Sequence, residues 1–316
     1  MVIRNSNHVG SFDSGTIDKR LGGTVQWYIT SREDINMRVP DEVRQCVVFV
    51  GLPIAGPDGQ ERLNFKGTAF FVSLPSETME GGNYIYLVTA KHVATKLEGQ
   101  RFLVRVNTKD GRSRLVQGEG VRWWYHPIDE SVDVAVIHWV PPPEVERKNI
   151  PSSMFLSDEI IRSESIGTGD EVFMTGLFAH LTGSARNLPI VRMGSIAMMP
   201  GEPVATKDFG DIEAYLIEAR SIGGLSGSPA FVRKTVPMGL GAFYLLGLMH
   251  GHWDIPPRNM DDVMQADEDV LGRVNMGIAI VVPAKKILEV LNQPHLVESR
   301  RQRDEQLKKE KNANTR

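Results

Sequence analysis

The chain has almost no cysteine, because Cys46 is the single one among 316 residues. One thiol cannot form an intrachain disulfide, which excludes the secreted proteins that disulfides hold together. The sequence also lacks any run near the ~18–20 apolar residues of a membrane-spanning helix. Its first eight residues, MVIRNSNH, have no apolar core of a signal peptide. We therefore expect a cytoplasmic protein in reducing surroundings, with no membrane partner.

Neither sign of charge dominates the chain. It has 36 Lys and Arg against 39 Asp and Glu, a formal net charge of −3. Nucleic-acid binding needs a basic surface, so we predict no nucleic-acid partner. A hydrophobic content of 41% allows a large core to be buried. The thirty glycines and eighteen prolines are spread along the chain, which is typical of an all-β protein with many turns.

A serine lies between glycines in GLSGSP, residues 224–229. Glycines let the backbone turn sharply and bring amide N–H groups beside the hydroxyl. A nucleophilic serine needs such donors, because an oxyanion develops next to it during attack on a carbonyl. An ordinary turn is the alternative, since Gly, Ser and Pro are common in turns.

A histidine and an aspartate upstream favour the catalytic interpretation. His92 follows the apolar run 84–90, a predicted strand that pairs with the run 67–72. Asp133 opens the apolar run 133–137, where a buried carboxylate needs a partner such as an imidazole N–H. Taken singly, the two residues could equally be a surface histidine and a strand-end aspartate.

The order of the three residues along the chain separates the known triad architectures. His92, Asp133 and Ser226 follow one another in the order of chymotrypsin-type proteins, whereas α/β-hydrolases run Ser, Asp, His. The α/β-hydrolase motif Gly-x-Ser-x-Gly also fails, because position 228 is serine. The order favours the first architecture.

Three blocks, TAKH (89–92), DVAV (133–136) and GLSGSP (224–229), carry a family resemblance. The chain resembles the trypsin/chymotrypsin-like serine peptidases, in particular the non-secreted bacterial type, over roughly residues 45–292. The resemblance implies an all-β fold of two six-stranded Greek-key barrels with a C-terminal helix and an active site between the barrels.

The resemblance also implies a role for each matching residue. His92 would be the general base and then the general acid, Asp133 would orient the imidazole, and Ser226 would be the nucleophile. The backbone N–H groups of Gly224 and Ser226 would form the oxyanion hole. Leu225 replaces the usual Asp or Asn before the serine and cannot accept a freed amino terminus, so activation by the usual cleavage is not expected.

The substrate pocket of the resembling fold is lined just before the nucleophile and by a later strand. Those positions point to Arg220, His250, Gly251 and His252 as substrate-binding candidates. Solvent or core positions are the alternative for these side chains. His250 and His252 could also share a metal with Asp254, but the spacing is generic, and we predict no metal and no cofactor.

The chain divides into four predicted regions. These are an N-terminal extension (1–40), a first barrel (41–150), a second barrel with a C-terminal helix (151–292), and a charged, disordered tail (293–316). The helix is predicted over 283–291, because its apolar residues recur at helical spacing.

The sequence thus predicts a serine endopeptidase, which hydrolyses peptide bonds through a Ser-His-Asp triad and an acyl-enzyme intermediate. Its partner would be a protein or peptide substrate. The alternative is a catalytically silent or gated module of the same fold that binds a peptide or protein. The natural substrate and the oligomeric state stay open.

Overall fold

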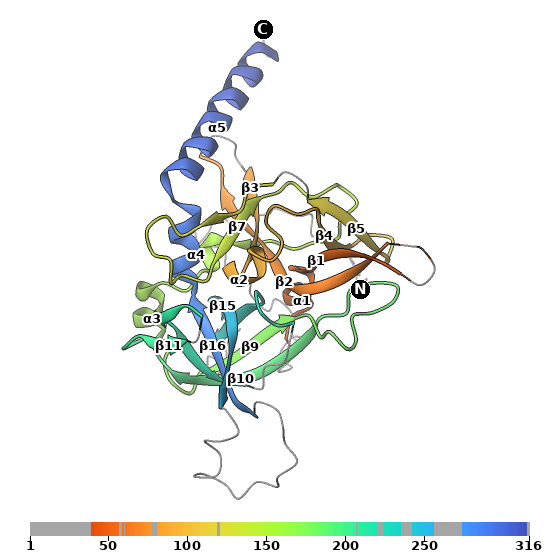
Figure 1. Cartoon of the computed structure of the whole chain (residues 1–316). Helices are drawn as coiled ribbons and strands as arrows, with labels where there is room; N and C mark the ends of the chain where they lie inside the picture. Colours follow the sequence, from red (N-terminus) through yellow and green to blue (C-terminus); the bar gives the residue numbers. More distant parts are fainter. Residues whose placement is uncertain are drawn as a thin grey trace, which may run out of the picture.

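The first half of the chain folds into one sheet. The computed structural model describes residues 39–56, 59, 61–77, 81–118, 121–206, 208–219, 224–234, 242–255 and 274–314. Seven strands follow one another in the order β5-β4-β1-β2-β3-β7-β6, and β8 runs parallel to β2. Strands β1 to β5 and β7 of this sheet are labelled in Figure 1. The strands are β1 (Val47–Ala55), β2 (Glu61–Pro75), β3 (Asn83–Thr89), β4 (Phe102–Asn107), β5 (Ser113–Gly118), β6 (Trp124–Tyr125), β7 (Ala135–His138) and β8 (Ile150–Pro151).

A bulge in β2 bends this sheet. The register between β1 and β2 shifts between Val50 and Gly51, and Lys66 of β2 is the extra residue. A Cβ atom at Gly51 would lie 2.1 Å from the backbone oxygen of Asn64, so a residue with a side chain would push the two strands apart. Bulges increase the local twist of a strand pair, which curls the sheet around its apolar face.

The second half closes into a six-stranded barrel. Its strands follow the order β10-β13-β16-β15-β14-β9, and a separate two-stranded hairpin, β11–β12, leaves it between β10 and β13. The strands are β9 (Glu171–Gly176), β10 (Ile190–Met198), β11 (Val204–Thr206), β12 (Gly210–Ile212), β13 (Tyr215–Glu218), β14 (Pro229–Lys234), β15 (Ala242–Ile255) and β16 (Val274–Pro283).

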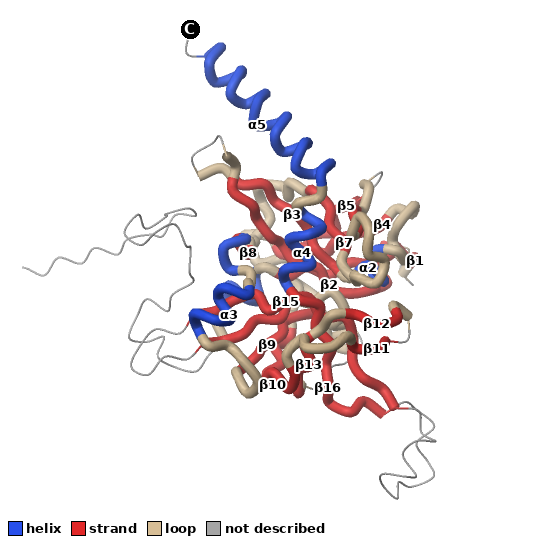
Figure 2. The backbone as a smooth tube through the Cα atoms, turned by 90° about the vertical axis from the view of Figure 1, so that its left-hand side faces the viewer, coloured by secondary structure: helices blue, strands red, loops and turns tan. Residues whose placement is uncertain are grey.

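Few helices accompany the strands. They are α1 (Asp41–Gln45), α2 (Lys91–Ala94), a 3₁₀ turn (Ser152–Met154), α3 (Asp158–Glu164), α4 (Ala284–Leu291) and α5 (Pro294–Asn314). The helix predicted over 283–291 is confirmed as α4, whose apolar side chains Ile287 and Leu291 are fully buried. It packs against β15 of the barrel and β7 of the first sheet (Figure 2).

The all-β prediction is confirmed, with a closed six-stranded barrel and a C-terminal helix. Among the described strands of the first half, the path ends at β5 and β6 without closing, so that half is an open counterpart of the barrel. Buried side chains of both halves, such as Phe71 and Phe231, belong to one continuous core cluster. The two halves are therefore packed together, and residues at their junction are held in fixed relation.

The end of the chain differs from expectation. The predicted disordered tail is a helix over Pro294–Asn314, of which the outer part projects from the body (Figure 1). Its buried Asp304 accepts a hydrogen bond of 2.7 Å from the Tyr84 hydroxyl, and Arg301 forms ion pairs with Glu298 and Glu305. These polar contacts stabilise the helix. Its sequence has no apolar stripe from which the helix could have been predicted. No described helix has the length and apolar content to cross a membrane. The predicted extension lies outside the described residues up to position 38.

Candidate active site

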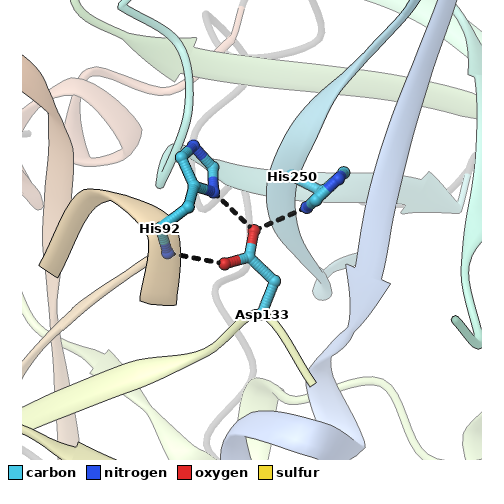
Figure 3. Close-up of side chains that lie close together, drawn as sticks. All are labelled: His92, Asp133 and His250. Atoms are coloured by element: carbon cyan, nitrogen blue, oxygen red, sulfur yellow. Dashed lines mark hydrogen bonds and ion pairs between the residues drawn. The ribbon is translucent and has the colours of Figure 1, made fainter. Parts of the chain in front are cut away.

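A short helix at the end of β3 positions His92. The strand predicted over 84–90 forms β3, pairs antiparallel with β2 as expected, and leads through buried Ala90 into α2. The backbone N–H of His92 donates to Oδ1 of Asp133 at 2.9 Å, and its Nδ1 lies 2.8 Å from Oδ2 (Figure 3). Two hydrogen bonds to one carboxylate fix both the backbone and the ring of this histidine.

Asp133 lies just before β7, between the buried side chains of Val132 and Val134. Its own side chain is 0% exposed, so the carboxylate depends on protein donors. Burial by itself raises the pKa of Asp133. Hydrogen bonds from His250 and His92, together with their charge, outweigh that effect and hold the pKa below its usual value. The carboxylate is therefore ionised at neutral pH and keeps a proton on Nδ1 of His92.

The loop that carries Ser226 is built by its glycines. Gly224 and Gly227 have φ angles of +101° and +83°, which residues with a side chain rarely adopt. A Cβ atom at Gly227 would lie 2.2 Å from the backbone oxygen of Thr68. Leu225, which replaces the acidic residue of the resembling family, is fully buried in the apolar core of the barrel.

Thr68 of β2 anchors this loop to the first half. Its backbone N–H donates to the carbonyl of Ser226 at 3.0 Å. Its hydroxyl donates to the carbonyl of Gly224 at 2.8 Å and accepts the N–H of Leu177 at 2.9 Å. Sequence analysis did not single out Thr68, since a threonine within a strand carries no signal of its contacts.

The hydroxyl of Ser226 does not meet His92. It donates to the carbonyl of His250 at 3.3 Å, and among the described residues it forms no hydrogen bond with His92. The N–H groups of Gly224 and Ser226 donate to no acceptor among the described residues. The structure thus joins His92 to Asp133, places Ser226 at the junction, and leaves both expected oxyanion donors free of described partners.

His250 reaches the same carboxylate from the barrel. The register of β15 against β16 passes from Met249 opposite Val281 to Gly251 opposite Ile280, so His250 is the extra residue of a bulge. Bulges re-aim side chains. Nδ1 of His250 lies 2.5 Å from Oδ2 of Asp133, the oxygen that also contacts His92 (Figure 3).

An aromatic side chain covers the two rings. Phe209, in the β11–β12 hairpin, has its ring centroid 6.3 Å from that of His92 and 5.4 Å from that of His250. The ammonium of Lys91 lies 5.9 Å from the same centroid and donates to the carbonyl of Glu130 at 2.9 Å. A lone aromatic in a polar turn was the available signal for Phe209, and sequence analysis did not use it.

No contact with His92 or Asp133 is recorded for the other substrate-binding candidates among the described residues. Gly251 and His252 follow His250 in β15 and are partly buried. Arg220 lies outside the described residues, as does the side chain of Asp254. Of the substrate-binding candidates, His250 is the one for which the structure records contacts with His92 and Asp133 among the described residues.

His92, Asp133 and His250 are also the one described group with the composition of a metal site, their ligand atoms lying within 4.8 Å of one another. Two ligands of a tetrahedral zinc ion are about 3.3 Å apart, given bond lengths near 2.0–2.1 Å. The nitrogen–oxygen distances of 2.8 and 2.5 Å are shorter and typical of hydrogen bonds. The residues as arranged form a hydrogen-bonded cluster, and we assign them no metal.

Comparison with solved structures finds proteins of similar fold. An HtrA-type protease, AlgW with a decapeptide, shares 17% sequence identity with this chain at a TM-score of 0.46, covering 82% of this chain and 73% of its own. Deg5 shares 17% identity at a TM-score of 0.37, covering 64% and 84% of the two chains. Both neighbours are serine proteases of the trypsin/chymotrypsin fold, the family that the sequence resembles. No family model and no curated protein sequence matches the chain.

Proposed function

We propose that this chain is a serine endopeptidase with His92, Asp133 and Ser226 as its catalytic triad. The observation that carries the proposal is the double hydrogen bond between His92 and the buried Asp133. An ionised carboxylate on Nδ1 leaves Nε2 of His92 as the free, basic nitrogen. That nitrogen is the one a general base must present to a serine hydroxyl.

The reaction follows from these groups. Ser226 Oγ attacks the peptide carbonyl carbon while Nε2 of His92 takes its proton, and Asp133 stabilises the imidazolium. The N–H groups of Gly224 and Ser226 hold the developing oxyanion. His92 then gives its proton to the leaving amine as the C–N bond breaks. A water molecule, deprotonated by His92, hydrolyses the resulting acyl-enzyme ester.

A second candidate function has its own supporting observation. The hydroxyl of Ser226 donates to the carbonyl of His250, and a hydroxyl has a single proton to donate. In that state Ser226 is not activated by His92. A gated or silent module of the same fold, which binds a peptide without cleaving it, is consistent with this arrangement.

A fluorophosphonate probe separates the two functions. If the site is a working peptidase, the probe adds one equivalent to the intact protein, measured by mass spectrometry, and Ser226→Ala abolishes the addition. Cleavage of a peptide library by the wild-type chain then gives the substrate preference. A wild-type protein that never reacts, with or without candidate peptide activators, refutes the peptidase and leaves the binding module.

A further inference from the structure

We infer that His250 is a positioning residue, which holds Asp133 from the barrel while Asp133 holds His92. The inference rests on the proposed function and deepens it. His92 and Asp133 belong to the first half of the chain, whereas Ser226 and His250 belong to the second. A link between the halves at this point sets the dyad against the nucleophile.

The geometry of the carboxylate supports this role. Oδ1 of Asp133 accepts the backbone N–H of His92, and Oδ2 lies 2.8 Å from Nδ1 of His92 and 2.5 Å from Nδ1 of His250. Because the carboxylate only accepts, both rings carry their proton on Nδ1. Asp133 is 0% exposed and the side chain of His250 only 12%, so water cannot readily replace the ring as a donor.

His250 also contacts the nucleophile through its backbone. Its carbonyl accepts the hydroxyl of Ser226 at 3.3 Å, while its ring holds Asp133. The bulge at His250 turns its ring toward the first half. In a regular strand, side chains point alternately to the two faces of the sheet, and the extra residue of a bulge departs from that alternation. One residue thus touches two members of the triad and reaches the third through Asp133.

Two substitutions distinguish positioning from simple space-filling. Asparagine in H250N places its amide N–H close to where Nδ1 stands, whereas glutamine in H250Q carries the amide one bond farther out. If the hydrogen bond to Asp133 matters, H250Q lowers kcat for peptide hydrolysis, or the rate of fluorophosphonate labelling, by about 10- to 100-fold. H250N retains most of the rate. Equal rates for the two variants, whether both high or both low, overturn the inference.

A spectroscopic measurement tests the pairing without any activity. In Ser226→Ala protein labelled with ¹⁵N-histidine, we expect two imidazole Nδ1–H proton signals shifted far downfield by their bonds to the carboxylate. Adding H250N removes one signal and leaves the other. The third described histidine–carboxylate pair, His126 with Glu289, is recognised separately, because its Nδ1 accepts the N–H of Asp129 and its proton is on Nε2.

The two measurements separate the possible failures. Fluorophosphonate labelling with only one Nδ1–H signal, or with two signals that H250N leaves unchanged, refutes the role of His250 and leaves the peptidase. If Ser226→Ala shows two such signals but the wild-type protein never reacts with the probe, the peptidase is refuted. The hydrogen bonds of both histidines to Asp133 are then still confirmed.

Discussion

The hydroxyl of Thr68 offers a sharp test of how the nucleophile loop is held. Thr68→Val keeps the shape of the side chain and its backbone hydrogen bond to Ser226 but deletes the hydroxyl. The carbonyl of Gly224 and the N–H of Leu177 then lose partners at 2.8 and 2.9 Å. Leu177 is 1% exposed, so water cannot readily satisfy its N–H.

The expected loss can be estimated from these contacts. Each buried group left without a partner costs about 1–3 kcal/mol, and the half-buried carbonyl of Gly224 belongs at the lower end. Valine fills the same volume, so no cavity forms. We expect the free energy of unfolding of Thr68→Val to fall by roughly 2–4 kcal/mol in urea denaturation. Labelling of Ser226 should slow as well, because Gly224 is no longer fixed.

The chain contains a matched control for this variant. Thr175 is fully buried, and its hydroxyl has no hydrogen-bond partner among the described residues. Thr175→Val removes an unpaired hydroxyl, so stability should stay level or rise by about 1 kcal/mol. Thr68→Ser keeps the hydroxyl and should restore the labelling rate. Equal losses of stability in the two valine variants would refute the reasoning.

Three further predictions concern buried polar groups. Burial raises the pKa of the Cys46 thiol, so Ellman's reagent should react with it only after denaturation; rapid reaction of native protein would contradict this. Because folding lowers the pKa of Asp133, the ionised carboxylate stabilises the folded protein at any pH above the pKa of this residue in the unfolded chain. This stabilisation is lost as the pH falls through the lower pKa of the folded state. The difference in unfolding free energy between wild type and Asp133→Asn should therefore shrink from about pH 6 to about pH 3, and a constant difference would argue against it. Tyr84→Phe removes a bond to Asp304, so hydrogen exchange should accelerate in α5 while fluorophosphonate labelling is unchanged; unchanged exchange would contradict the anchor.

The pairing of His92 with Asp133 could be predicted because each residue has a strong local setting. An apolar run of strand residues leads directly to His92, and another starts beside Asp133. Neighbouring strands β3 and β7 then bring the two side chains together, since Thr89 lies opposite Ala135. Local patterns suffice where both partners are a few residues from paired strands.

The contacts made across the two halves could not be predicted in this way. His250 and His252 alternate regularly in the sequence, which suggests side chains on one face of a strand. The bulge at His250 depends on how β15 pairs with β16, and nothing in the local residues specifies it. The same holds for α5, where Asp304 is stabilised by Tyr84 some 220 positions away.

The rotamer of Ser226 is a still finer detail. Staggered side-chain positions differ by little energy, and a single hydrogen bond contributes about 1 kcal/mol to the balance. Donation to the carbonyl of His250 is therefore of the same magnitude as donation to a neighbouring imidazole. If Ser226 is the proposed nucleophile, its activation requires that its hydroxyl exchange the carbonyl of His250 for Nε2 of His92 as hydrogen-bonding partner. No sequence pattern specifies that choice, because the competing hydrogen bonds are of similar strength.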